Sequence, residues 1–519
     1  MFTRRQIVAT AATGLLAAPA ILSQARAARW FGQYPFSLGV SAGEPSQDGF
    51  VIWTRIAPDA LSPHGGMPMS PVPVTWEVSE KTDFSVIVAK GEYVARPEMG
   101  HSVHVEVTGL QPGRPYWYRF FCGGEKSVRG LAKTMPPAGA SLAQLKFGVA
   151  GCQNYEDGLY TAFNFLARED LAFVFHYGDY IYENRSYEGR PGRSGTTFPK
   201  VRHHLTDDIY DITDYRHRYA QYTLDPDLQF ARSRQTWFPT FDDHEIVDNW
   251  VGDFDNGEGH DSPPEYFRLR KAAAFQAWYE HMPVRRSMWP QGSLLPNSYR
   301  QARFGNLLSI DFLDTRQFRS DQPCGDGFRT YCPDVAKADA QVLGSEQEAW
   351  LMKNLQRRDA KWNCLAQQVM MMALDRRTGN EPEKILNFDS WASYDVPRKR
   401  LLSRIKGLDN VIVLTGDEHQ NFAGELLDGD KPVAVEFVST SISSGGDGSD
   451  KRSGSDTILA NNPQLKFIND QRGYLICDVQ DEAWSTDYMV VDQISQPGGK
   501  LSKRATISVA RGEPKLNVA

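Results

Sequence analysis

Apolar and polar residues alternate in several short stretches between residues 36 and 135. β-Branched and aromatic residues fill the apolar positions, and glycine, proline and aspartate separate one stretch from the next. Alternation of this kind is typical of strands that bury one face and expose the other. The predicted strands lie within GFVIWTRI, PVTWEVSE, FSVIVAKGEYVA, HSVHVEVTGL and PYWYRFFCG.

One connection between these strands indicates how they pack. The stretch VTGLQPGRPYWYRF is similar to the corner between strands E and F of an immunoglobulin-like or fibronectin type III sandwich. Leu110 takes the position that closes the core before a Pro-Gly turn. We therefore expect an N-terminal β-sandwich over residues 28–142, and we assign it no catalytic role because such sandwiches usually serve as scaffolds.

The pattern changes near residue 143, where apolar runs begin to alternate with segments of helical spacing. The helical segments are GLYTAFNFLARED and SEQEAWLMKNLQRRD, and the second begins with a serine that can cap it. These features predict an α/β domain over residues 143–519, with a C-terminal tail from residue 497. The buried strands are predicted within LKFGVAGCQ, LAFVFHYGD, NLLSIDFLDTR, KWNCLAQQVMMM and NVIVLTGDEH.

Residues 1–27 are predicted to be a signal peptide that precedes the fold. Arg4 and Arg5 stand before an apolar run ending at Leu22, and Ala-Arg-Ala at 25–27 is a small-x-small cleavage signal. The run is too short and too rich in alanine and glycine for a stable membrane anchor. TRRQIV resembles a twin-arginine export signal, and an ordinary secretion signal is the alternative. We expect a periplasmic or secreted protein, exported by the twin-arginine machinery.

Length, composition and charge limit the classes of function. The chain has 519 residues, of which 41% are hydrophobic, so we expect a soluble globular protein with more than one domain. The formal net charge of −7 opposes a nucleic-acid partner and opposes steering of an anionic substrate by the whole molecule. Any anion site must therefore be local, and the sequence does not specify an oligomeric state.

Two of the six cysteines lie close together in PCGDGFRTYCP, a short stretch rich in turn residues. Cys324 and Cys332 are able to form a disulfide in an oxidising compartment. Their spacing alone does not establish that bond.

Candidate metal ligands follow several of the predicted buried strands. Because ligands bind beyond the carboxyl ends of strands in α/β folds, we expect these residues to meet at one edge of one sheet. Taken singly, each has an ordinary structural role: core packing, a helix cap, a solvated acidic turn or a structural histidine. Their coincidence predicts a metal centre. The residues are Cys152, Asp179, Tyr182, Asp242, Asp243, His244, Glu245, Asp417 and His419.

At these residues the chain resembles the alkaline phosphatase D family, a branch of the calcineurin-like metallophosphoesterases. The resemblance extends over nearly the whole mature chain, and HYGDYIYE together with FDDHEIVDNW is its most specific part. Two departures are small: GVSAGEP replaces a common Ser-Gly-Asp-Pro variant, and Glu418 stands where a smaller residue is frequent. The other matching stretches are GVSAGEPSQDGFVIWTR, GVAGCQN, DYRHRYAQYTLDPDLQ, LDTRQFRS, VLTGDEH, EFVSTSISS and NDQRGYLICDV.

The resemblance implies a sandwich of β-sheets flanked by helices, with a centre of iron(III) and calcium. In this reading Asp179 bridges the two metals, and Asp243 and Asp417 complete the calcium side. Anionic thiolate, phenolate and carboxylate donors suit a trivalent ion, whereas oxygen donors suit calcium. Zinc sites more typically use histidines and cysteines, and histidines are few here. The implied iron ligands are Cys152, Asp179, Tyr182 and His419.

The same resemblance implies hydrolysis by attack of a metal-bound hydroxide on phosphorus. His244 is expected to contact phosphate and to protonate the leaving oxygen. Arg316 is a weaker candidate for a phosphate clamp, and a structural ion pair is its alternative. Gln367 and Gln368 stand where relatives often carry a metal-binding histidine, and we do not count them as ligands.

The favoured function is therefore an exported hydrolase of phosphate monoesters and diesters. A phospholipase D-type phosphodiesterase acting through the same site is an alternative. A secreted binding protein with a structural metal site is the alternative from a different class, and turnover of a chromogenic phosphate diester would distinguish it.

Overall fold

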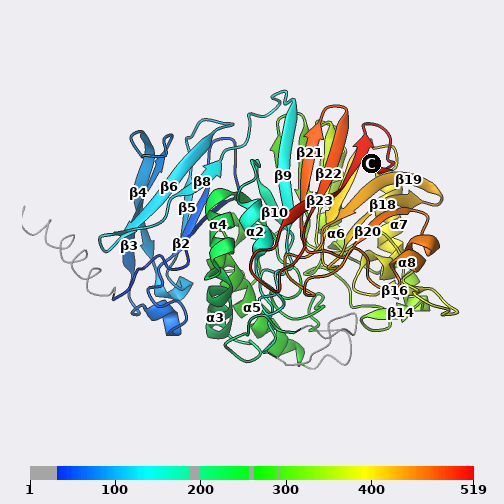
Figure 1. The fold of residues 1–519 in the computed structure, drawn as a ribbon, viewed down its shortest axis with the longest axis horizontal. Helices are drawn as coiled ribbons and strands as arrows, with labels where there is room; N and C mark the ends of the chain where they lie inside the picture. The colour runs from blue at the N-terminus through cyan, green and yellow to red at the C-terminus, as the bar shows by residue number, and fades with distance from the viewer. Residues whose placement is uncertain (1–31, 187–198, 256–261, 290–291, 409, 519) are drawn as a thin grey trace, which may run out of the picture.

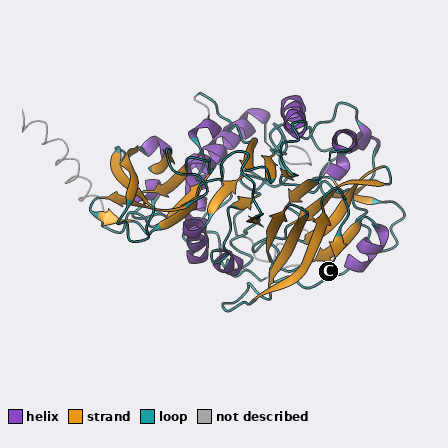
Figure 2. Cartoon of the chain, turned by 90° about the horizontal axis from the view of Figure 1, so that it is seen from above, coloured by secondary structure: helices purple, strands orange, loops and turns teal. Residues whose placement is uncertain are grey.

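The computed structural model describes residues 32–186, 199–255, 262–289, 292–408 and 410–518. The predicted signal peptide lies outside these ranges. Figure 1 shows a β-rich N-terminal part beside a helical region, followed by a larger region of two sheets with helices outside them. The same arrangement is seen from above in Figure 2.

The N-terminal strands form the predicted β-sandwich. A 5-stranded sheet has the order β4-β3-β6-β7, with β8 paired to β6. Strands β1, β2 and β5 face it, and buried side chains such as Ile52, Val74 and Tyr118 form the core between them. The strands are β1 Val40–Gly43, β2 Phe50–Arg55, β3 Val72–Ser79, β4 Ile87–Ala95, β5 Ser102–Val107, β6 Pro115–Cys122, β7 Glu125–Lys126 and β8 Gly130–Lys133.

The predicted corner of the sandwich is confirmed. Leu110 is buried, with 7% of its surface exposed. The Tyr116 hydroxyl accepts a hydrogen bond from the Gln111 amide at 2.9 Å and donates one to the Gln111 carbonyl at 3.3 Å. A tyrosine bonded back to the chain just upstream fixes such corners in immunoglobulin-like sandwiches.

The sandwich and the α/β region share one sheet, which the sequence pattern did not predict. This 10-stranded sheet has the order β24-β23-β22-β21-β9-β10-β11-β1-β2-β5. Strand β1 pairs in parallel with β11, with Ala42 opposite Thr236. The remaining strands are β9 Gln144–Ala150, β10 Val174–His176, β11 Thr236–Pro239, β21 Gly473–Gln480, β22 Ala483–Val491, β23 Leu501–Ala510 and β24 Asn517–Val518.

The segment expected to be a C-terminal tail is instead part of this sheet. Strand β23 pairs antiparallel with β22 along most of its length, and β24 pairs with β23 at the sheet edge. The sequence TISVAR alternates apolar and polar residues, and its apolar members Ile507 and Val509 enter the core between the sheets. The alternation of apolar and polar residues over this stretch therefore indicated a strand rather than a tail.

A second, 7-stranded sheet faces the middle of the first and has the order β12-β13-β15-β17-β19-β18-β20. Strands β13, β15, β17 and β19 are parallel. The short pair β14 Phe328–Thr330 and β16 Ile385–Asn387 lies apart from it. The strands are β12 Arg300–Phe304, β13 Leu308–Phe312, β15 Trp362–Ala366, β17 Val411–Thr415, β18 Asn421–Asp428, β19 Lys431–Val438 and β20 Leu465–Asn469.

The central strands are mostly apolar because both of their faces are buried. Val149 and Phe175 point into the core between the two sheets, whereas Ala150 and Val174 contact the helices outside. Helices α2 to α5 cover the outer face of the large sheet, and α6 and α7 cover the outer face of the small one. The predicted α/β sandwich flanked by helices is confirmed.

The helices vary in how they begin. Asp211 caps α3 by accepting from the Thr213 and Asp214 amides, but the serine expected to cap α6 lies inside that helix, which Leu343 precedes. The α-helices are α2 Thr161–Leu166, α3 Ile212–Thr223, α4 Pro226–Arg234, α5 Pro264–His281, α6 Gly344–Leu355, α7 Asp395–Ile405 and α8 Ser455–Asn461. The 3₁₀ helices are η1 Pro63–Gly66, η2 Pro97–Met99, η3 Arg286–Met288, η4 Pro333–Ala336 and η5 Trp391–Ser393.

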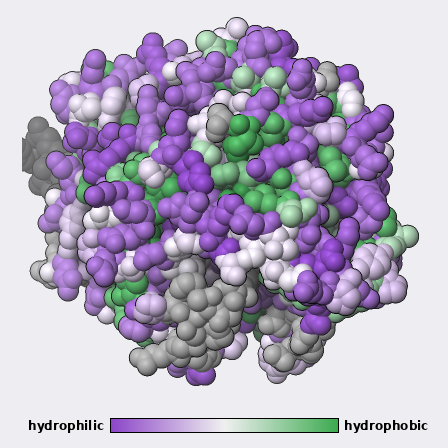
Figure 3. Space-filling view, turned by 45° about the vertical axis from the view of Figure 1, so that its right-hand side comes forward, coloured by the Kyte–Doolittle hydropathy of each residue, from purple (hydrophilic) through white to green (hydrophobic). Residues whose placement is uncertain are grey.

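The described part of the chain contains no helix long and apolar enough to cross a membrane. The face in Figure 3 is mostly hydrophilic, with hydrophobic side chains gathered near its centre. Cys324 and Cys332 form a disulfide, with their Cα atoms 6.7 Å apart. The bond that spacing alone left open is therefore present in the structure.

Candidate metal centre

The candidate ligands follow strands of both sheets. Strands β9, β10 and β11 are parallel neighbours, so Cys152, Asp179 and Asp243 meet beyond one edge of the large sheet. Asp417 and His419 follow β17, which belongs to the small sheet. The expectation of a single sheet was wrong, because the ends of β9, β10 and β17 converge across the core that separates the two sheets.

A tyrosine and two glycines bring these strand ends together. The Tyr177 ring lies so close to Gly151 and Gly416 that an added Cβ would stand 2.4 Å and 2.2 Å from it. Any other residue at either position would push the two sheets apart at this edge. The Tyr177 hydroxyl donates to the Thr440 carbonyl at 2.9 Å, which fixes the ring between the strands.

The backbone at four of the candidate ligands is left-handed rather than extended. The φ angles are 51° at Cys152, 55° at Asp179, 64° at Asp417 and 53° at His419. Non-glycine residues adopt this region at a cost of about 1–3 kcal/mol each, and they persist there only when their surroundings hold them. Such turns aim each side chain away from its strand direction and into the space between the sheets.

One group of side chains, which we call the mixed cluster, contains a thiol, a carboxylate, a phenol and an imidazole. Ligand atoms of Cys152, Asp179 and His419 lie within 4.8 Å of one another. The Tyr182 hydroxyl donates to Asp179 Oδ2 at 2.8 Å and lies 3.2 Å from His419 Nε2. The Cys152 thiol donates to the same carboxylate oxygen at 3.3 Å. All four side chains expected to share one ion are therefore within reach of one point.

A second group, the acidic cluster, consists of Asp242, Asp243 and Asp417, whose carboxylate oxygens also lie within 4.8 Å of one another. Asp179 belongs with Asp243 and His244 in an overlapping group. Asp179 therefore stands between the two clusters, where a bridging ligand is expected. Asp242 was among the candidate ligands in the sequence, but it was not in the ligand set implied by the family resemblance.

The charge of these groups calls for a cation. Burial raises the pKa of Asp179 and Asp242 well above the ordinary range, and Asp243 adds to the effect by repulsion. Burial likewise raises the pKa of Cys152 and Tyr182. Among the described residues, Asp179 Oδ1 and Asp242 Oδ2 are buried without a hydrogen-bond partner. A multivalent cation would bind such oxygens and favour the anionic forms, so the donor set fits a metal centre.

His244 lies over the mixed cluster, and both of its ring nitrogens face carboxylates. Its ring stacks on Tyr182 with the ring centres 4.0 Å apart. Its Nδ1 lies 2.7 Å from Glu183 Oε2, and its Nε2 lies 3.5 Å from Asp248. Burial would lower the pKa of His244, but Glu183, Asp243 and Asp179 outweigh it and raise the pKa well above its usual value. These carboxylates therefore favour the protonated form of the imidazole.

Family models cover most of the chain. The model of the PhoD-like phosphatase matches residues 147–488, and that of the PhoD-like phosphatase N-terminal domain matches residues 22–136. The chain belongs to the PhoD-like phosphatase family. Alkaline phosphatase D of Bacillus subtilis (strain 168) is 44% identical over 493 residues, which are 93% of this chain and 82% of that protein.

Solved structures agree with this membership in the PhoD-like phosphatase family. A structure of PhoD superposes with a TM-score of 0.89 at 42% identity, covering 94% of this chain and 93% of that one. Purple acid phosphatase PPD1 from yellow lupin seeds has a TM-score of 0.54 at 12% identity, covering 91% and 74%. This second likeness concerns the fold alone. The chain is thus a phosphoric ester hydrolase, and the alternative of a secreted binding protein is set aside.

Arg316 lies beneath the acidic cluster of this PhoD-like phosphatase and is fully buried. Its Nε donates to Asp242 Oδ1 at 2.5 Å and one terminal nitrogen donates to Asp389 at 2.7 Å. The other terminal nitrogen lies 3.5 Å from Asp243. Of the two roles considered for Arg316, these contacts favour the structural ion pair over the phosphate clamp.

Two residues position the PhoD-like site in ways that the sequence did not indicate: Glu245, expected as a candidate metal ligand, and Ser444, which was not singled out. Glu245 accepts hydrogen bonds from the backbone amides of Asp179, Tyr180 and Asp242 at 2.7–3.0 Å, so it joins the turns after β10 and β11. Ser444 lies 2.7 Å from the Tyr182 hydroxyl. Both residues stand in quoted family motifs, DDHE and EFVSTSISS, so the motifs themselves were the available signal.

The residues that we left out of the PhoD-like ligand set have other partners. Gln368 accepts from the Thr315 amide and hydroxyl and donates to the Leu313 carbonyl, and Gln367 accepts from the Trp391 indole. Tyr180 points away from Asp179, with its hydroxyl 3.2 Å from that of Thr223.

Proposed function

We propose that this phosphatase is an exported hydrolase of phosphate monoesters and diesters that works through iron(III) and calcium. The observation that carries the proposal is the pair of clusters that meet at Asp179. A thiol, a phenol and an imidazole on one side, and only carboxylates on the other, suit two ions of different character.

The mixed cluster would hold iron(III) through Cys152, Asp179, Tyr182 and His419. Asp179 would bridge to calcium, and Asp243 and Asp417 would complete the calcium side. We do not count Asp242 as a ligand, because one of its oxygens already pairs with Arg316. When bound, the ions would neutralise phosphate oxygens and supply a hydroxide nucleophile from water at neutral pH.

The chain itself supplies the proton for the leaving group. Glu183 and Asp243 favour the protonated form of His244, and its stacking on Tyr182 fixes the plane of the ring. Its position beside Asp179 and Asp243 suits donation to the leaving oxygen of a phosphate held at the two clusters. Arg316 would contribute by holding Asp242 in place rather than by touching the substrate.

The test combines elemental analysis with turnover. We expect protein purified from the exported fraction to contain iron and calcium and to hydrolyse p-nitrophenyl phosphate and bis(p-nitrophenyl) phosphate. The ratio of the two rates would rank monoester against diester activity, including the phospholipase D-type alternative. Fully active protein free of iron would overturn the metal assignment, and no turnover of either ester with both metals supplied would overturn the proposed function.

Export is proposed from residues 1–27, which lie outside the described residues. Replacement of Arg4 and Arg5 by lysine should leave unprocessed protein in the cytoplasm, because paired arginines are the recognised feature. Normal secretion of the double variant would show that an ordinary signal operates. We also propose that residues 28–142 act as a scaffold and that residues 143–519 carry the chemistry.

A further inference from the structure

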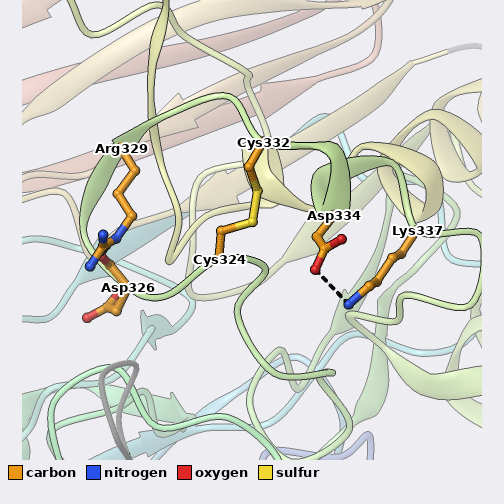
Figure 4. Close-up of a disulfide and its surroundings, with 6 residues drawn as sticks. All are labelled: Cys324, Asp326, Arg329, Cys332, Asp334 and Lys337. Atoms are coloured by element: carbon orange, nitrogen blue, oxygen red, sulfur yellow. Dashed lines mark hydrogen bonds and ion pairs between the residues drawn. A yellow bond between two sulfur atoms is a disulfide. The ribbon is translucent and has the colours of Figure 1, made fainter.

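The disulfide joins Cys324 to Cys332, and the segment that contains it, residues 322–332, contacts Asn249. We call this segment the disulfide loop. Figure 4 shows Asp326 and Arg329 inside the loop, and Asp334 with Lys337 beyond Cys332. The Arg329 Nε donates to the Asp326 carbonyl at 2.6 Å, so the backbone around Asp326 is tied within the loop.

Asn249 connects this loop to the acidic cluster. Its side-chain amide donates to Asp326 Oδ2 at 2.6 Å, and its carbonyl accepts from the Gln322 side chain at 2.7 Å. Its backbone amide donates to Asp243 Oδ2 at 2.7 Å. The φ angle of Asn249 is 54°, a left-handed conformation that persists only when surrounding contacts hold it. Two of those contacts come from the disulfide loop.

The loop reaches the acidic cluster by a second route. Its strand β14 pairs with β16, and the Phe388 amide donates to the Gly327 carbonyl at 2.9 Å. The next residue, Asp389, accepts from Arg316 at 2.7 Å and from Arg319 at 2.8 Å. Arg316 in turn holds Asp242. The loop is thus linked to both Asp242 and Asp243, whereas its contacts do not extend to Cys152 or Tyr182 in the hydrogen bonds described.

We infer that Asp326 is a positioning residue for the calcium side of the centre and that the disulfide holds it in place. The inference rests on the proposed function, because it concerns the calcium ion assigned there to Asp179, Asp243 and Asp417. Asp326 fixes Asn249, and Asn249 orients Asp243 through its backbone amide. Partners that orient metal ligands in this way usually change metal affinity about 10- to 100-fold when they are removed.

The experiment compares calcium binding by iron-loaded protein in four forms. We expect Asp326→Ala and the double variant Cys324→Ser with Cys332→Ser to raise the calcium Kd about tenfold or more in isothermal titration calorimetry. Asp326→Asn should recover much of the affinity, because its amide oxygen still accepts from Asn249. The matched control is Asp334→Ala, which removes an exposed carboxylate paired only with Lys337 at 2.9 Å in the ion pairs described. It should leave the Kd unchanged.

Two further readouts separate this inference from others. Iron(III) bound by a phenolate or thiolate absorbs visible light. This absorption band should be unchanged in all four variants, because none of them alters the mixed cluster. Wild-type calcium affinity in Asp326→Ala and in the double serine variant would overturn the inference while the proposed function stands. If Asp326→Ala does not fold, the calcium Kd of the double serine variant tests the inference, and a wild-type Kd would overturn it. Wild-type protein that takes up iron but no calcium would overturn the calcium assignment and this inference together.

Discussion

The mixed cluster and the acidic cluster meet at Asp179, but they balance their charge in different ways. In the mixed cluster, two uncharged groups, the Tyr182 hydroxyl and the Cys152 thiol, donate hydrogen bonds to the Asp179 carboxylate. In the acidic cluster, Arg316 places a permanent positive charge against the carboxylates. The acidic cluster is therefore balanced in part by a permanently charged arginine, whereas the cationic group beside the mixed cluster is the titratable His244, which stacks on Tyr182.

This difference predicts which property each substitution should change. A change in the mixed cluster should alter the bound iron and its spectrum, because those side chains are the proposed iron ligands. A change around the acidic cluster should alter stability or calcium binding, because a buried arginine and its carboxylates depend on each other. Four substitutions test the comparison, and they follow in order of expected effect.

Asp179→Asn should have the largest effect, because Asp179 belongs to both clusters. Loss of the shared carboxylate weakens both ions, and metals supply several kcal/mol of transition-state stabilisation. We expect kcat/KM to fall roughly 10⁴-fold or more, since about 1.4 kcal/mol is tenfold. Phosphatase assays would measure the fall in kcat/KM, and elemental analysis would measure the metal content. Asp170→Asn, which removes an exposed carboxylate, is the control. If Asp179→Asn loses only one of the two metals, Asp179 is not a ligand of both ions.

His244→Asn should remove the proton donor while leaving both clusters in place. General acids contribute roughly 10²- to 10⁴-fold, and the contribution is greatest when the leaving group is a poor one. We therefore expect a large loss with alkyl phosphates and a much smaller loss with nitrophenyl phosphates. Equal losses for the two classes of ester would indicate that His244 only binds phosphate.

Arg316→Met should destabilise the fold, because it leaves Asp242 and Asp389 buried without their cation. Breaking a buried ion pair from one side typically costs about 3–5 kcal/mol. Urea unfolding would measure the loss, and Arg511→Met, whose ion pair with Glu482 is at the surface, should leave stability nearly unchanged. A raised KM with unchanged stability would instead identify Arg316 as a phosphate clamp.

Tyr182→Phe should have the smallest effect on stability, about 0.5–1.5 kcal/mol for the lost hydrogen bonds, but a clear spectral effect. A phenolate on iron(III) absorbs visible light, so the band should shift or weaken while the ring still stacks on His244. Tyr180→Phe should leave the band unchanged, because its hydroxyl faces Thr223. An unchanged band in Tyr182→Phe would exclude Tyr182 as a ligand.

The sequence allowed much of the site to be predicted because its side chains follow apolar strands directly. Cys152, Asp179 and Asp417 each stand just beyond a run that could only be a buried strand, so their meeting at a sheet edge followed from the fold class. The sequence did not indicate that β17 lies in a second sheet, because strand pairing depends on contacts between residues that are far apart in the chain. The role of Arg316 was unresolved for the same reason, since it depends on partners such as Asp389 in a distant loop.

The pairing of β1 with β11 has a consequence for the order of events during synthesis. Ala42 and Thr236 are paired although 236 − 42 = 194 residues separate them. At roughly 5–20 residues per second, β1 waits about 10–40 s on the ribosome before its partner is made. During that interval the sandwich presents an unprotected strand edge, which favours pairing with other chains. Nascent chains are thus most exposed to aggregation before residue 236 emerges, and a chaperone that covers β1 would act in that interval.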